Sequence, residues 1–291
     1  MAGNSVPVFF GAKARTKRPP GLDVTFTTDL SGSMKPYADF ISAQPTIIAL
    51  ENELAAQGVG ILSTNRYSFT TGGGRAPNFS TLPQIELPVK VDNVSKRWAT
   101  GAEVLANRVT LPSLVANKIQ DTEDMGLSTN LIANNDRQYL SSNQLIVVSS
   151  SDEQQGITVT AFDTTPVYSY RYVGIHSVNI TITEPAGPNA IPAGTLTGFV
   201  YTTNTTGTAI YVSGTTINYR TDVPVANVTA TATTNKPGGA ATVQSLVDQT
   251  RDTNGAIYDI RLFQGSTANL QFPTLATSLG NVLGRFLFDI S

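Results

Sequence analysis

The stretch that decides the fold is Leu22-Asp23-Val24-Thr25-Phe26-Thr27-Thr28-Asp29-Leu30-Ser31-Gly32-Ser33-Met34. Its first half alternates apolar and polar side chains, which predicts a β-strand. Its second half brings one carboxylate and two hydroxyls, from Asp29, Ser31 and Ser33, to the carboxyl end of that strand. Such oxygen ligands suit a hard cation such as Mg²⁺, which keeps several of its waters. A plainer interpretation is that Ser33 only caps a following helix.

Composition narrows the class of protein. The 291 residues are 40% apolar with a mean hydropathy of −0.04, which predicts a soluble globular protein with one large or two moderate domains. The net charge of −2 and the 14% of charged residues give no basis for binding nucleic acid. The chain has no cysteine, which excludes disulfides and thiolate metal sites. No apolar run approaches the ~20 residues of a membrane span, and residues 1–20 lack the apolar region of a signal peptide.

Three later segments contain glycines or polar residues next to a predicted strand or helix. Asn65–Thr71 alternates like a second strand and leads into three glycines. Asp121–Leu127 contains Thr122 and three carboxylates and precedes a predicted helix. The apolar strand Gln144–Val148 ends in three serines followed by Asp152. Because loops at the carboxyl ends of adjacent parallel strands converge, residues this far apart in sequence can meet.

The motif Asp29-Leu30-Ser31-Gly32-Ser33 resembles the Asp-x-Ser-x-Ser motif of von Willebrand factor type A (vWA) domains, which opens their metal-ion-dependent adhesion site. The three later segments resemble further vWA segments in the same order. The resemblance covers about residues 22–178 and 240–288. It departs from the family at Ile119-Gln120-Asp121, where glycines are usual, and Thr129 competes with Thr122 for the place of the metal-side threonine.

The resemblance implies a metal site and a fold. The cofactor would be Mg²⁺, or Mn²⁺ or Ca²⁺ in its place. The fold would be α/β, a doubly wound and mostly parallel sheet flanked by helices, with a β-rich insertion. Ser31 and Ser33 would bind the metal directly, Thr122 directly or through water, and the two aspartates through waters. The implied metal ligands are Asp29, Ser31, Ser33, Thr122 and Asp152.

The domain organisation follows from where the pattern changes. We expect an N-terminal arm at residues 1–20, a vWA-like core at 21–178 and 239–291, and a β-rich insertion at 179–238, where Thr, Val, Ile, Asn and Gly alternate. Within the core, periodicity predicts strands at 22–28, 65–71, 85–91, 144–148, 170–178 and 256–260. It predicts helices at 36–43, 45–57, 100–109, 126–135, 241–250 and 275–286.

Catalysis finds little support in the sequence, so we expect no enzyme. The chain has one histidine, His176, on a predicted strand, and we interpret it as a strand or surface residue. Glu123 and Asp124 could form an acid/base pair, but acidic residues at the start of a helix commonly complement its dipole. The glycines at 72–74 lack the Lys and Ser or Thr of a phosphate-binding loop.

The resemblance implies a metal-dependent protein-binding or adhesion module. An acidic residue of a protein partner or host receptor would complete the coordination of the cation. The alternative is a structural component of a virion, such as a phage particle or tail, or of another surface assembly. In that case residues 1–20 and 179–238 would contact neighbouring subunits. Both functions suit an extracellular, cell-surface or virion location, reached without a classical signal peptide.

Overall fold

We describe the fold from a computed structural model of the chain. The description covers residues 21–29, 34, 44–56, 64–71, 86–112, 138–151, 170–176, 179–183, 194–196, 199–202, 209–213, 216–220, 229–233, 249, 253 and 256–259. The expected arm at 1–20 and the helices expected at 36–43, 126–135 and 275–286 lie outside these residues, and only Gln249 is described of the helix expected at 241–250.

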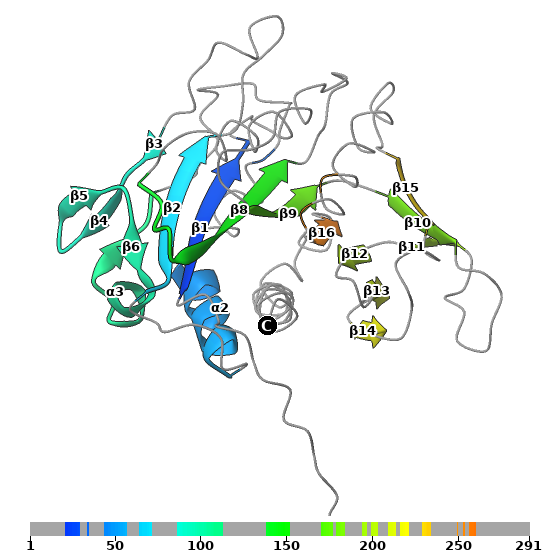
Figure 1. The fold of residues 1–291 in the computed structure, drawn as a ribbon, viewed down its shortest axis with the longest axis horizontal. Coiled ribbons are helices and arrows are strands. Elements are labelled where there is room, and N and C mark those ends of the chain that lie inside the picture. Colours follow the sequence, from blue (N-terminus) through cyan, green and yellow to red (C-terminus); the bar gives the residue numbers. More distant parts are fainter. Residues whose placement is uncertain are drawn as a thin grey trace, which may run out of the picture.

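The centre of the fold is a parallel sheet. Its strands are β1 (Gly21–Thr28), β2 (Arg66–Thr71), β8 (Asn143–Ser151), β9 (Tyr170–His176) and β16 (Ala256–Asp259), in the spatial order β2-β1-β8-β9-β16. Each neighbouring pair is parallel, and the arrows of β2, β1, β8 and β9 point the same way in Figure 1. Together with helix α2 (Gln44–Ala56), which connects β1 to β2, this sheet confirms the predicted α/β class.

Antiparallel strands extend this sheet to ten strands. On one side β2 pairs with β3 (Glu86–Leu87) and β6 (Ala99–Thr100). On the other side β16 is followed by β12 (Phe199–Thr202), β13 (Ala209–Ser213) and β14 (Thr216–Arg220). The predicted β-rich segment therefore contributes three strands to the main sheet. Its strands β10 (Asn179–Thr183), β11 (Gly194–Leu196) and β15 (Thr229–Thr233) form a separate sheet. The division of the chain into domains stays a prediction.

Strand β1 is buried on both faces. Leu22, Val24 and Phe26 occupy one face, and Phe26 stacks on Phe69 with ring centroids 5.3 Å apart. This apolar face belongs to the side of the sheet on which α2 packs, because Tyr67 of β2 bonds to Glu51 of α2. The other face carries polar side chains that are equally buried, Asp23, Thr25, Thr27 and Asp29. Alternation alone suggests that such residues face water, but here Asp23, Thr25 and Asp29 form hydrogen bonds to neighbouring strands, Thr25 to Ser68 at 2.9 Å.

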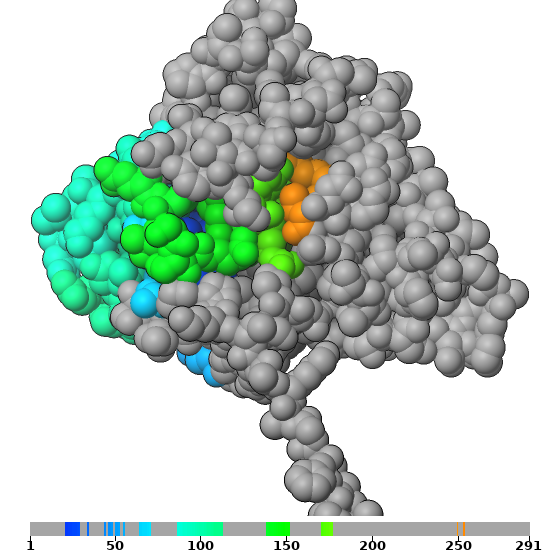
Figure 2. All heavy atoms as spheres, viewed as in Figure 1, coloured from blue at the N-terminus to red at the C-terminus, as the bar shows by residue number. Residues whose placement is uncertain are grey.

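A small antiparallel sheet lies at one edge of the molecule (Figures 1 and 2). It is formed by β5 (Val94–Lys96), β4 (Val89–Val91) and β7 (Val109–Thr110). Asp92 and Asn93, with φ of 49° and 65°, form the two-residue hairpin turn between β4 and β5. Helix α3 (Gly101–Leu105) precedes β7 and begins with a capping box between Thr100 and Glu103.

Helix α3 ends earlier than the helix predicted over residues 100–109. Its last residue is Leu105, and Asn107 has a φ of 56°, in the left-handed region that interrupts a helix. Val109 and Thr110 then pair with β4. The predicted helix at 45–57 agrees with α2, and the predicted strands at 22–28, 65–71, 144–148, 170–178 and 256–260 agree with β1, β2, β8, β9 and β16 to within a few residues.

Candidate functional site

Asp29 is the one predicted metal ligand within the described residues, and it lies where the sequence predicts it. It directly follows β1 and is buried. Its backbone N–H donates to the Ser150 carbonyl at 2.9 Å, and the Ser151 hydroxyl donates to its Oδ2 at 2.9 Å. The carboxyl ends of β1 and β8 are thus tied together. The other four predicted ligands, Ser31, Ser33, Thr122 and Asp152, lie outside the described residues, although Asp152 is next to Ser151 in sequence.

The strand order reverses at this point. From β1 the chain passes to β2 on one side, whereas β8, β9 and β16 follow on the other. In open α/β sheets, ligands bind outside the carboxyl ends of the strands at such a reversal. Asp29 is at this position because it follows β1, and Thr28 pairs with Ser150 in β8. The topology therefore favours a ligand site beside Asp29 independently of any motif.

Three neighbouring strands end in a row of polar residues on one face of the sheet. Ser151 pairs with His176 in β9, and Asp29 follows Thr28, which pairs with Ser150. Because paired residues of parallel strands point to the same side, the row reads Asp29, Ser151, His176. All three side chains are buried. Hydroxyl, carboxylate and imidazole groups therefore lie together at the carboxyl ends of β1, β8 and β9, where the strand order favours a ligand site.

His176 is buried on β9, so its interpretation as a strand residue is confirmed and the surface alternative is wrong. Its Nε2 lies 2.8 Å from the Tyr172 hydroxyl and 3.2 Å from Ser149 Oγ. Gly174 makes the first contact possible, since a Cβ there would lie 2.8 Å from the Tyr172 hydroxyl oxygen. Burial lowers the pKa of His176 to about 3, so the imidazole is neutral at physiological pH.

The Ser149 and His176 pair lacks the third member of a catalytic triad in the described part of the chain. A triad needs a carboxylate on the histidine nitrogen that faces away from the serine. Here Nδ1 of His176 is buried and has no hydrogen-bond partner. With its pKa lowered to about 3, His176 is also a weak base at neutral pH. Both observations make this pair a poor candidate for nucleophilic catalysis.

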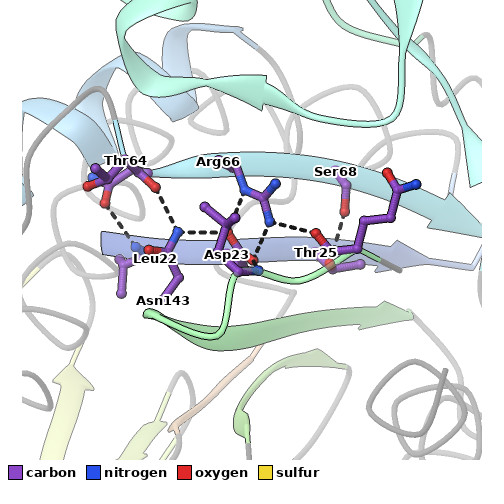
Figure 3. Close-up of polar contacts among 10 residues, drawn as sticks. Leu22, Asp23, Thr25, Thr64, Arg66, Ser68 and Asn143 are labelled. Carbon is purple, nitrogen blue, oxygen red and sulfur yellow. Dashed lines mark hydrogen bonds and ion pairs between the residues drawn. The ribbon is translucent and has the colours of Figure 1, made fainter. Parts of the chain in front are cut away.

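A second buried polar cluster lies near the amino ends of β1, β2 and β8, and Figure 3 shows its side chains. The carboxylate of Asp23 accepts two bonds from Arg66, at 2.8 and 2.5 Å, and one each from the Leu140 backbone and the Asn143 side chain, both at 2.8 Å. The Arg66 guanidinium also lies 4.5 Å from the Trp98 ring centroid. Asp23 thus holds β1, β2 and β8 in register. The sequence analysis did not identify this role of Asp23, and the available signal was a carboxylate between the apolar residues of a predicted strand.

A third cluster joins α2 to the apolar side of the sheet. Glu51 of α2 is fully buried and accepts hydrogen bonds from Tyr67 and, at 3.3 Å, from Asn65. Asn65 in turn accepts the backbone N–H of Leu22 at 3.0 Å. Burial raises the pKa of Glu51, and burial together with the Glu51 charge raises the pKa of Tyr67. The polar side chains of this cluster bond to one another and to the backbone within the protein, so we interpret the cluster as structural.

Two further features bear on binding. A pocket of about 290 Å³ between β3 and β5 has Glu86 and Arg97 in its wall, and their side chains pair at 2.9 Å. Asp29, the one predicted ligand among the described residues, does not line it. In the described ranges no three His, Cys, Asp or Glu side chains gather as a metal cluster. Neither helix among these residues has the length and apolar character needed to cross a membrane.

The donors present around Asp29 fit a hard cation. A buried carboxylate with a hydroxyl beside it offers only oxygen atoms, which are the ligands Mg²⁺ prefers. The proposed set adds hydroxyls and one further carboxylate, so it contains no more than two acidic side chains.

Comparisons with known proteins give only distant similarity. No protein-family model matches the sequence, and no curated protein matches it. Among solved structures, the chain is similar to an aerotolerance-related membrane protein from Bacteroides fragilis that carries multiple mutations to serine. The identity is 15% and the TM-score 0.34, over 90% of this chain and 99% of the other.

It is also similar to the pilus adhesin SpaC from Lactobacillus rhamnosus GG. For one structure the identity is 8% and the TM-score 0.32, over 92% of this chain. For the open conformation the identity is 11% and the TM-score 0.30. The chain spans 30% and 29% of the adhesin chain in the two structures. Similarities of this size carry no argument about function.

Proposed function

We propose that the chain is a vWA-like domain that binds a protein partner through Mg²⁺ at the carboxyl ends of β1 and β8. The observation that supports this most is the position of Asp29. It is buried, it is fixed to β8 by two hydrogen bonds, and it lies where the strand order reverses. A carboxylate there suits a ligand site better than a structural role, since turns and caps do not require this place in the sheet.

The proposed ligands are Asp29, Ser31, Ser33, Thr122 and Asp152. The described residues support the proposal at two points, because Asp29 directly follows β1 and Ser151, the last residue of β8, lies beside it. When bound, the cation would supply an open coordination position for an oxygen of the partner. An acidic side chain is the partner group that such a position favours, so the function we propose is binding and not catalysis.

The proposal can be tested with purified protein stripped of metal by EDTA. A cation that binds only the folded state stabilises it by about 2.7 kcal/mol at a concentration 100 times its Kd. We therefore expect Mg²⁺ to raise the melting temperature of the wild type and to give a saturable calorimetric titration. Asp29→Ala should remove both effects. Equal heats and equal melting shifts in the two proteins would refute the proposed site.

A matched control is Asp92→Ala. Asp92 is an exposed aspartate in the turn between β4 and β5, in a three-stranded sheet separate from the one that contains β8, so its loss should leave Mg²⁺ binding unchanged. Light scattering with and without EDTA then addresses the alternative. Particles or rings that form regardless of EDTA, in a protein that binds no Mg²⁺, would favour the structural component of an assembly.

A further inference from the structure

The hydroxyl of Ser151 bonds to the Asp29 carboxylate from a second strand. Ser151 is the last residue of β8, and its Oγ donates to Asp29 Oδ2 at 2.9 Å. Neither side chain has appreciable exposure to solvent. A hydrogen bond from a neutral donor to a buried carboxylate is a strong one, because no water competes for it. The direction of the carboxylate is thus set from β8 and not only from its own loop.

The backbone of Asp29 is fixed separately. Its N–H donates to the Ser150 carbonyl at 2.9 Å, which continues the parallel ladder by one residue beyond β1. Removing the Ser151 hydroxyl would leave this backbone bond in place. The main chain of Asp29 would stay beside β8, while its carboxylate would lose one of the contacts that fix its orientation. The two effects can therefore be separated by a single substitution.

The other serines of β8 have different partners. Ser149 shares the face of Ser151, but its Oγ lies 3.2 Å from His176 Nε2. Ser150 is on the opposite face, and its hydroxyl donates to Thr28 Oγ1 at 3.2 Å. All three are fully buried. In this run of three serines, the hydroxyl of Ser151 bonds to the predicted metal ligand, whereas the hydroxyls of Ser149 and Ser150 bond to other side chains.

We infer that Ser151 is a positioning residue for the cation site, holding the Asp29 carboxylate in the orientation that metal binding requires. This inference rests on the proposed Mg²⁺ site. Groups that hydrogen-bond a metal-binding side chain orient it, and their loss typically weakens metal affinity by about 10 to 100-fold. In this assignment Ser151 acts on Asp29 through the hydrogen bond that it donates, and it is not one of the five proposed ligands.

The test compares Ser151→Ala with Ser150→Ala in the full chain. Each variant removes one buried hydroxyl from β8 and one hydrogen bond to β1, so both should lower the melting temperature of the metal-free protein. Titration with Mg²⁺, and with Mn²⁺ as a second probe, then measures affinity. We expect Ser151→Ala to bind at least about tenfold more weakly than the wild type, and Ser150→Ala to bind within about twofold of it.

The outcomes distinguish this inference from the proposed function. If the wild type binds and Asp29→Ala does not, but Ser151→Ala binds like Ser150→Ala, the inference is wrong and the metal site stands. An equal loss of affinity in both serine variants also overturns it, since that result reports a general weakening of β8. If the wild type binds neither cation, the proposed site fails and Ser151 has only a structural role.

Discussion

Acidification should destabilise this protein through its single histidine. His176 is buried, and burial lowers its pKa from 6.5 to about 3. Between these two values the unfolded chain binds a proton on this histidine that the folded protein does not, so the contribution of His176 to stability rises with pH across this window and is constant above it. The contribution is fully present above pH 6.5 and is lost as the pH falls.

The size of the effect follows from the same two values. Each pH unit below 6.5 removes about 1.4 kcal/mol of unfolding free energy, so about 2 kcal/mol is lost by pH 5. This is a sizeable share of the 5 to 15 kcal/mol typical of a folded domain. The loss should be visible as a shift in the midpoint of urea denaturation.

The assay is urea denaturation at pH 7.5, 6.5, 5.5 and 5.0 for the wild type and for His176→Gln. Glutamine does not titrate and can still bond to the Tyr172 hydroxyl, which lies 2.8 Å from the histidine nitrogen. We expect the variant to be less stable at pH 7.5 but to lose about 2 kcal/mol less than the wild type down to pH 5. The difference in stability loss between the two proteins excludes the contribution of the carboxylates, because these titrate in both.

Two results would refute this reasoning. One is an equal loss of stability in both proteins. The other comes from the imidazole resonances in an NMR titration, which are unambiguous because the chain has one histidine. A midpoint near 6.5 in the folded protein would mean that the ring is not desolvated. This second measurement remains decisive even if His176→Gln does not fold.

Three further predictions concern the buried clusters. Asp23→Ala should lower the unfolding free energy by about 3 kcal/mol or more, because it leaves a largely buried arginine without its carboxylate partner, whereas Arg108→Ala, which removes the exposed Arg108–Asp92 pair, should leave the urea midpoint nearly unchanged. Gly101→Ala should destabilise by about 1 to 3 kcal/mol although alanine is the better helix former, since its Cβ would clash with Glu51 Oε1; a double-mutant cycle with Glu51→Ala that shows no coupling would contradict this. Because burial raises the pKa of Glu51, the folded protein binds the Glu51 proton more tightly than the unfolded chain does. The contribution of Glu51 to the unfolding free energy should therefore fall as pH rises above about 4.5. Glu51→Gln should remove this pH dependence, as measured by urea denaturation at several pH values.

The main sheet could be predicted because its strands show a clear pattern of apolar residues along the sequence. Alternation marks β1 and β2, and a continuous apolar run marks β8, so their existence and approximate bounds follow from sequence. The position of Asp29 followed from the same pattern, since it comes directly after β1. Its closeness to β8 followed from the convergence of parallel strands.

The buried polar contacts could not be predicted in the same way. Asp23 pairs with Arg66, 43 residues away, and with Asn143, 120 residues away, and no local period encodes such partners. The burial of His176 likewise depends on what packs against β9. Loop residues are placed by backbone turns and long-range contacts and not by periodicity, so the positions of Ser31, Ser33, Thr122 and Asp152 remain predictions.

The central place of β1 in the sheet has a consequence for biosynthesis. Its neighbour β8 lies about 122 residues further along the chain, as in the pairing of Thr25 with Val147. At a translation rate of 5 to 20 residues per second, a nascent chain needs roughly 6 to 24 s to extend from one strand to the other. During that interval β1 has no β8 to pair with, and its apolar residues Leu22, Val24 and Phe26 are covered incompletely. We therefore expect a ribosome-bound intermediate that exposes an apolar strand to chaperones.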